Sequence, residues 1–179
     1  MPVADSGLFA GASTRDRTAG LEAANAYDAL IAKEPVVDPG GGLLTLRDEI
    51  HAWAAFSQGD SDTAAGLLST VAARERKVGK CEVELPACEI LAEIRLLDGK
   101  AVEALQAYQL SLSSNPNRFN GLLGAARAAE LAGQAALAAG YYSTLLTQCK
   151  DASGASSGGT IARPCRMILE RNLDVFTPS

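Results

Sequence analysis

The stretch "LLDGKAVEALQAY", residues 96–108, decides the fold because its outline recurs as "ELAGQAALAAGYY", residues 130–142. A glycine, an alanine and a tyrosine hold the same places in both copies, 34 residues apart. These pairs are Gly99 with Gly133, Ala104 with Ala138, and Tyr108 with Tyr142. In each copy we expect the glycine to end one helix and a two-residue turn to follow. The alanine and the tyrosine then lie one turn apart on the next helix.

The rest of the chain also shows apolar residues at helical spacing, interrupted by short polar or glycine-rich breaks. Apolar residues make up 47% of the sequence and aromatic residues only 5%, so alanine and leucine carry the apolar content. This composition favours helices over strands, and the sequence predicts an all-α fold of about seven or eight helices. The predicted helices are 16–33, 43–58, 61–78, 85–98, 101–114, 119–132, 135–149 and 163–175, with a glycine- and serine-rich linker at 151–160.

The glycine, the alanine and the aromatic residue occupy positions that resemble those of the tetratricopeptide repeat (TPR) family. In that family a proline also closes each repeat, as Pro116 does here. The resemblance implies antiparallel helical hairpins stacked as a short right-handed solenoid, with repeats at about 85–118 and 119–152. A weaker copy at about 45–78 precedes a six-residue insertion, 79–84. That copy has Gly59, Ala64 and Leu68 in the glycine, alanine and aromatic places.

A longer run is similar to the C-terminal repeats of a bacterial TPR subfamily of undefined function. It is "PACEILAEIRLLDGKAVEALQAYQLSLSSNPNRFNGLLGAARAAELAG", residues 86–133. The resemblance brings no set of catalytic residues with it. Members of the subfamily carry this run near the end of a longer chain, which implies that this chain lacks N-terminal repeats of its relatives. We expect a flexible N-terminus at 1–15, one helical domain at 16–175 and a C-terminal capping helix at 163–175.

Small residues crowd the helix that follows the turn "NPNRFN", residues 115–120. A helical hairpin cannot bury its apolar face alone, and close helix crossings need small side chains. We therefore expect this helix to have neighbours on several sides. In the turn we expect Asn117 to cap the helix and Phe119 to pack beneath the joint. The small residues are Ala125, Ala126, Ala128, Ala129 and Ala132.

In stacked TPR hairpins the first helix of each repeat lines a concave groove, and the resemblance carries eight groove positions over to this chain. They are Glu49, Trp53, Phe56, Glu89, Glu93, Asn120, Arg127 and Glu130. Aromatic residues at one end and carboxylates in the middle suit a partner peptide with apolar and basic side chains. The version of the family that binds acidic tails needs several lysines and asparagines here, so an acidic partner is disfavoured.

Structural interpretations of the same residues stay open. Glu89 and Glu93 are four residues apart and also fit a solvated helix face. Trp53 and Phe56 also fit packing between helices. His51 has no catalytic partner at a diagnostic spacing, so we interpret it as a structural or surface histidine.

The leading functional hypothesis is a non-enzymatic module that binds a protein or peptide in the groove, without a cofactor. The first alternative is structural: a segment of a longer helical-repeat protein, or a subunit that self-associates. A remote alternative is a small metal-binding or hydrolytic protein that uses Glu49, Glu89 and Glu93, with His51 as a further candidate. The sequence contains no H-E-x-x-H, Walker or dinucleotide-binding motif.

The net charge of the chain argues against nucleic acid as a partner, and the short length of its apolar runs argues against a membrane span. The formal net charge is −5, and no basic face is evident, so nucleic acid is not an expected partner. The basic cluster "RERKVGK", residues 74–80, fits a solvated helix end. No apolar run approaches the roughly 20 residues that span a bilayer. The first residues lack the basic and apolar regions of a signal peptide.

Four cysteines form two local pairs in the sequence: Cys81 with Cys88, and Cys149 with Cys165. Two local disulfides would imply an oxidising compartment and favour a periplasmic or secreted location over a cytoplasmic one. Four ordinary thiols are the alternative, and a zinc site is a weaker one because no C-x-x-C spacing is present.

Overall fold

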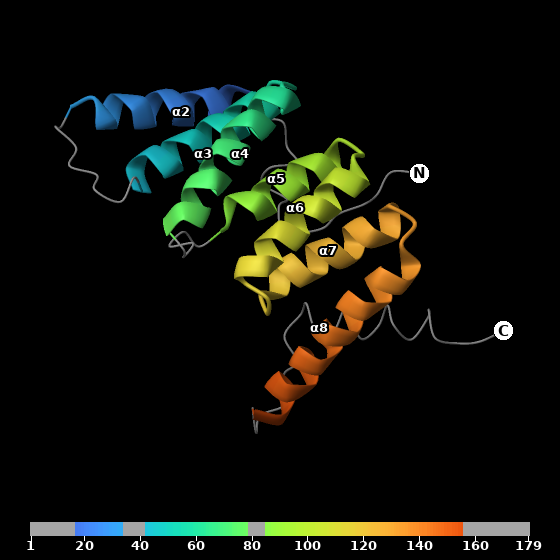
Figure 1. The fold of residues 1–179 in the computed structure, drawn as a ribbon. Coiled ribbons are helices and arrows are strands. Elements are labelled where there is room, and N and C mark those ends of the chain that lie inside the picture. Colours follow the sequence, from blue (N-terminus) through green and yellow to red (C-terminus); the bar gives the residue numbers. More distant parts are fainter. Residues whose placement is uncertain (1–16, 34–41, 79–84, 156–179) are drawn as a thin grey trace. The chain divides into compact units, whose positions relative to one another are not determined.

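In a computed structural model of the chain, residues 17–33, 42–78 and 85–155 are described, and every regular element among them is an α-helix (Figure 1). The helices are α2 (Arg17–Ile31), α3 (Gly42–Ser57), α4 (Ser61–Val78), α5 (Ala87–Leu97), α6 (Ala101–Ser114), α7 (Phe119–Leu131) and α8 (Ala135–Ala155). The predicted all-α class is confirmed. The predicted N-terminus at 1–15, the insertion 79–84 and the helix 163–175 lie outside the described residues.

The chain divides into two compact units, residues 1–94 and 95–179, which we call unit 1 and unit 2. Unit 1 contains α2, α3, α4 and most of α5. Within it, α3 packs against both α2 and α4. Unit 2 begins in the last turn of α5, and within it α7 packs against both α6 and α8.

The same pair of backbone hydrogen bonds closes the turns after α3, α5 and α7. In each turn a glycine amide donates to the carbonyl three residues back, and the next amide donates to the carbonyl five residues back. These glycines have φ values of 88°, 75° and 73°, a left-handed conformation that glycine adopts without strain. They are Gly59, Gly99 and Gly133. The predicted glycine-ended turn is therefore confirmed in all three copies.

The alanine that follows each turn is buried, as the repeat register predicts. Ala64 and Ala104 are fully buried, and Ala138 is 3% exposed. The aromatic place one turn later is buried in the first two copies and half-buried in the third. Its occupants are Leu68, Tyr108 and Tyr142.

Small residues bring α7 close to its neighbours in unit 2. Four of its alanines are fully buried: Ala125, Ala126, Ala128 and Ala129. A Cβ atom built on Gly124 would lie 2.1 Å from Cζ of Tyr108, a residue of α6 that is itself buried. The glycine is therefore what lets the tyrosine ring lie against the α7 backbone.

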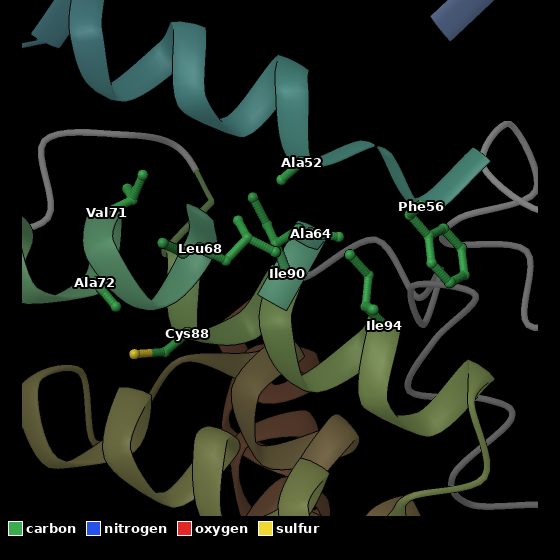
Figure 2. Packing of buried hydrophobic residues seen from close by; sticks show 10 residues of the cluster. Ala52, Phe56, Ala64, Leu68, Val71, Ala72, Cys88, Ile90 and Ile94 are labelled. Carbon is green, nitrogen blue, oxygen red and sulfur yellow. The ribbon is translucent and has the colours of Figure 1, made fainter. Parts of the chain in front are cut away.

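Larger apolar side chains fill the core of unit 1, at the junction of α3, α4 and α5 (Figure 2). Leu68, Val71 and Ile94 are fully buried, and Ile90 is 2% exposed. Trp53 packs against this cluster from α3 while remaining half-buried. This junction is therefore packed with bulky side chains, whereas α7 packs against its neighbours through alanine and glycine.

Two local predictions in unit 2 are wrong. The predicted linker at 151–160 begins late, because α8 continues to Ala155. Glycine and serine cost a helix only about 1 kcal/mol or less per residue, so their presence did not end it. Asn117 does not cap α7: Arg118 occupies the cap position, and no side chain makes the capping hydrogen bond.

Candidate functional site

The structure buries half of the predicted groove residues. Glu49, Phe56, Glu89 and Glu93 expose 6%, 8%, 3% and 2% of their surface. Trp53, Asn120 and Arg127 are half-buried, and Glu130 is exposed. These three buried carboxylates, those of Glu49, Glu89 and Glu93, therefore present little charge to a partner. Helical spacing had placed Glu89 and Glu93 on one face correctly, but it could not reveal that this face is covered, so the solvated-face interpretation is wrong.

In unit 1, one of the two aromatic residues predicted for the groove packs inside the core instead of facing a partner. Trp53 and Phe56 meet edge to face, with ring centroids 6.1 Å apart and planes inclined at 75°. Phe56 belongs to the buried cluster, whereas Trp53 keeps part of its surface accessible. Trp53 is therefore the aromatic residue of the set that a partner can reach.

In unit 2 the accessible groove residues all lie on α7. Asn120 and Arg127 are half-buried, and Glu130 lies at the C-terminal end of the helix. The hydroxyl of Tyr142, on α8, donates a hydrogen bond of 2.7 Å to Oε2 of Glu130. This contact fixes the glutamate on the surface of the α7–α8 pair.

Glu75 was not among the predicted site residues, but it holds the start of α5 in unit 1. Its two carboxylate oxygens each accept a hydrogen bond from the backbone amide of Ala87 at 3.2 Å. The free amides at a helix N-terminus favour a negative partner, so this contact also suits the helix dipole. The sequence placed Glu75 in a solvated basic cluster; of the described side chains in that cluster, Arg76 and Lys77 are exposed, whereas Arg74 and Glu75 are half-buried.

Glu49 lies near this contact, on α3. Its burial, and secondly the charge of Glu75, raise the pKa of the Glu49 carboxyl from 4.5 to about 7. Its buried Oε1 atom has no hydrogen-bond partner. Burial, followed by Glu75, also raises the pKa of the nearby Cys88 thiol.

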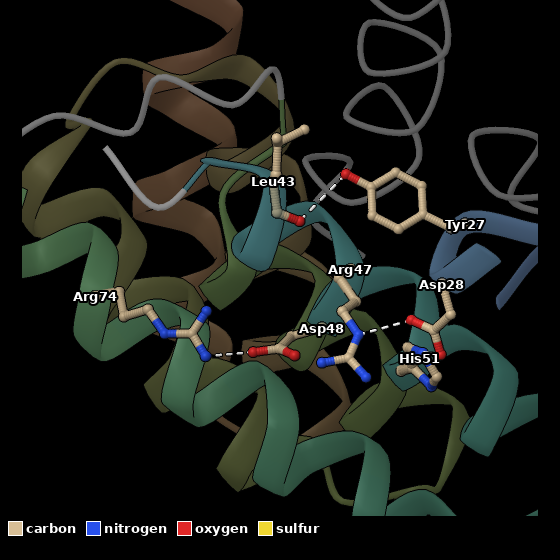
Figure 3. Close-up of polar contacts among 7 residues, drawn as sticks. All are labelled: Tyr27, Asp28, Leu43, Arg47, Asp48, His51 and Arg74. Atoms are coloured by element: carbon tan, nitrogen blue, oxygen red, sulfur yellow. Dashed lines mark hydrogen bonds and ion pairs between the residues drawn. The ribbon is translucent and has the colours of Figure 1, made fainter. Parts of the chain in front are cut away.

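A set of ion pairs joins α2, α3 and α4 (Figure 3). Asp28 on α2 accepts hydrogen bonds from Nε of Arg47 at 2.7 Å and pairs with Nε2 of His51 at 3.1 Å. These contacts, with Arg47 first, lower the pKa of Asp28. On the other side of α3, Arg74 pairs with Asp48. The interpretation of His51 as a structural histidine agrees with this contact.

The cysteines differ from the predicted pattern in one respect. Cys88 is a buried free thiol, so a bond between Cys81 and Cys88 is not formed in this structure. Close spacing in sequence does not by itself set the geometry that a disulfide needs. The pairing of Cys149 with Cys165 stays a prediction, because Cys165, like Cys81, lies outside the described residues.

Two further features bear on ligands. Across residues 17–33, 42–78 and 85–155, no three acidic, cysteine or histidine side chains are placed to hold a metal ion. A polar hollow of about 590 Å³ lies in unit 2 beside α8. It is lined by Asn117, Ser143, Thr144, Thr147 and Gln148, none of which is charged. In the part of the chain that is described, no helix is long and apolar enough to cross a membrane.

Repeated helix–glycine–helix turns, buried alanines and the absence of strands among the described residues define an all-α, TPR-like helical-repeat protein. A solved structure with this fold is titled "Crystal structure of MamA protein"; it superimposes with a TM-score of 0.56 at 15% sequence identity. The match covers 84% of this chain and 82% of that one, so the likeness extends over most of both folds. The sequence matches no family profile, and it has no significant match among curated proteins.

Sequence reasoning missed two residues that shape these surfaces. Glu75 lies among basic residues, and only the spatial position of the next helix reveals its role. Gly124 carried a usable signal, because it stands inside an alanine-rich helix where glycine normally destabilises. Such a glycine indicates a close approach, here by Tyr108.

Proposed function

We propose that this chain is a non-enzymatic interaction module that binds a protein or peptide through the first helices of its repeats. The accessible contact residues are Trp53 on α3 and Asn120, Arg127 and Glu130 on α7. The observation that carries the proposal is the TPR-like fold, since helical hairpins of this kind offer extended surfaces for partners.

Burial of the acidic residues changes the expected partner. With Glu49, Glu89 and Glu93 covered, a row of basic side chains on the partner has no exposed carboxylates to meet there. We expect instead an apolar or aromatic anchor against the accessible part of Trp53. In unit 2, hydrogen-bonding groups on a partner would suit Asn120 and Arg127.

The test is affinity capture of partners by the tagged full chain, quantified by mass spectrometry. Trp53→Ala combined with Asn120→Ala should reduce recovery of specific partners at least tenfold. Leu67→Ala is the matched control, because Leu67 is also half-buried and packs against the same apolar cluster from α4. If both variants keep the wild-type circular dichroism spectrum and retain partners equally, the proposed contact residues are wrong.

A second candidate function is assembly with further copies or with neighbouring repeats. It is favoured by large apolar side chains on the surface of unit 1: Leu30 is 62% exposed on α2, and Leu44 is 49% exposed on α3. Sedimentation velocity over a wide concentration range would reveal self-association. A Leu30→Gln, Leu44→Gln variant should then remain monomeric where the wild type associates, whereas a strictly monomeric wild type would refute self-assembly.

A further inference from the structure

We propose that the C-terminal segment of the chain covers the last described helix of unit 2. The segment is the predicted helix 163–175, which lies outside the described residues. It docks on the α8 strip, which consists of Ala139, Tyr142 and Leu146. These three residues are spaced by three and four positions, so they share one face of α8.

The earlier copies of the repeat show what covers the equivalent of the α8 strip. In unit 1, Leu68 of α4 belongs to one buried cluster with Ile90 of α5, the first helix of the next repeat. In unit 2, the ring of Tyr108 on α6 lies against Gly124 of α7, again the first helix of the next repeat. Tyr142 holds the same place in the third copy as Leu68 and Tyr108. A helix that follows α8 in the chain is therefore the expected occupant of the strip.

The α8 strip is more accessible than its equivalents. Ala65 of α4 and Leu105 of α6 expose 4% and 3% of their surface. Ala139, at the same place on α8, is exposed, and Tyr142 and Leu146 are half-buried. The α7 helix packs against α8 and yet leaves the strip partly accessible. The described residues of unit 2 therefore leave room for one more helix.

The C-terminal segment has the length and the pattern that this position requires. The predicted helix 163–175 is as long as α7, which has 13 residues. Helical spacing places its apolar residues on one face and charged residues on the opposite one, and such a helix gains stability by burying the apolar face. The apolar face consists of Cys165, Ile168, Leu169 and Leu173, and the charged face of Glu170, Arg171 and Asp174.

The short connection, residues 156–162, sets the direction of the segment. Helices joined by so short a connection run antiparallel when they pack together, and both rise by about 1.5 Å per residue. Cys149 is 3% exposed and lies about two turns beyond Tyr142, on the same face of α8. If Cys165 lies beside Cys149, the antiparallel register brings Leu173 beside Tyr142. The predicted pairing of the two cysteines thus agrees with the docking, which does not itself require a bond between the sulfur atoms.

Docking of the segment closes this end of the repeat array. A second copy cannot then stack on α8, because the segment presents its charged face to solvent in place of the apolar strip. Assembly between copies, if it occurs, has to use other surfaces, such as the exposed leucines of α2 and α3. The docking itself does not depend on whether Trp53 binds a partner.

Hydrogen exchange of the full chain tests the docking. The variant Leu169→Gln, Leu173→Gln removes most of the apolar face of the segment. The amides of Tyr142 and Leu146 should then exchange at least tenfold faster than in the wild type, because the helix that covers them is released.

The charged face of the same segment supplies a matched control. Glu170→Gln, Asp174→Gln also makes two changes to glutamine, but on the side that faces solvent. This control should exchange at the wild-type rates. Unchanged exchange of the α8 amides in Leu169→Gln, Leu173→Gln would overturn the proposal.

Nuclear Overhauser contacts in the unmodified protein keep the docking testable should the variants fail to fold. Ring protons of Tyr142 should show contacts with methyl protons of Leu169 or Leu173 in the same chain. A mixture of isotope-labelled and unlabelled chains separates contacts within one chain from contacts between chains. Contacts between chains alone would overturn the proposal in favour of a second copy, and the absence of both kinds would refute it outright.

Discussion

Units 1 and 2 fill the same place in the repeat with different pairs of side chains. In unit 1, Leu68 of α4 and Ile90 of α5 belong to one buried cluster. In the repeat register the corresponding pair in unit 2 is Tyr108 of α6 and Gly124 of α7, where the ring lies against the glycine. Unit 2 therefore has one large side chain that faces a residue without a side chain, where unit 1 has two side chains of medium size.

We infer from this exchange that the two positions are sterically coupled, because the tyrosine ring of unit 2 leaves no space for a side chain at the glycine. Cores tolerate changes that conserve volume and shape together, and they resist changes to one member alone. The units also differ in polarity. The unit 1 junction includes Glu49, Glu75 and ion pairs, whereas the described contacts of α7 are mostly apolar. Unit 1 should therefore respond to pH and salt, and unit 2 to side-chain size.

The largest expected effect is at Gly124. Gly124→Ala would place a methyl group 2.1 Å from the buried Tyr108 ring and should cost about 3 kcal/mol of unfolding free energy. Gly140→Ala on α8 is the matched control, because nothing lies within 4 Å of its Cβ position. That variant should gain about 0.5–1 kcal/mol from the better helix former. Urea unfolding measures both, and a loss for the two variants alike would contradict the close approach.

Ala126→Leu tests the crossing of α7 from a second position. Ala126 is fully buried, so three added carbon atoms have no space and should cost about 1–3 kcal/mol. Ala136→Leu, at an exposed position on α8, should change stability by less than about 0.5 kcal/mol. Equal unfolding midpoints for the two variants would show that α7 is not closely packed.

The overall stability should fall as pH rises because of Glu49. Its pKa in the folded protein, about 7, lies above the ordinary value of 4.5. The stability it confers is thus complete below pH 4.5 and is lost as pH rises through 7. We expect a loss of about 2.5 kcal/mol between pH 5 and pH 8, below a ceiling of about 3.4 kcal/mol set by the size of the shift.

Denaturant titrations of wild type and Glu49→Gln check this expectation. The variant should lack this loss, so the difference between the two proteins should itself change with pH. Parallel pH profiles would contradict the account of Glu49.

The smallest effect is expected at the α2–α3 contact. Asp28→Asn removes the ion pair with Arg47 and weakens the contact with His51, both largely accessible to solvent, so the cost should be below about 1 kcal/mol. Added salt should reduce that cost further, because exposed pairs are screened. A cost above 2 kcal/mol that is insensitive to salt would show that this contact is part of the core.

The turns and their register could be predicted from the sequence because the responsible residues act locally. Gly99 and Gly133 end helices through their own backbone conformation, whatever surrounds them. The state of Glu89 and Glu93 could not be predicted, since helical spacing defines a face but not what covers it.

The measurement that tests the comparison most directly is a double-mutant cycle on Tyr108 and Gly124. Tyr108→Leu gives α6 the residue that Leu68 provides in unit 1, and it makes room for a side chain at Gly124. If the two positions share one volume, Gly124→Ala should cost at least about 1 kcal/mol less in the Tyr108→Leu background than in the wild type. An identical cost in both backgrounds would contradict the claim that Tyr108 and Gly124 are sterically coupled at this crossing.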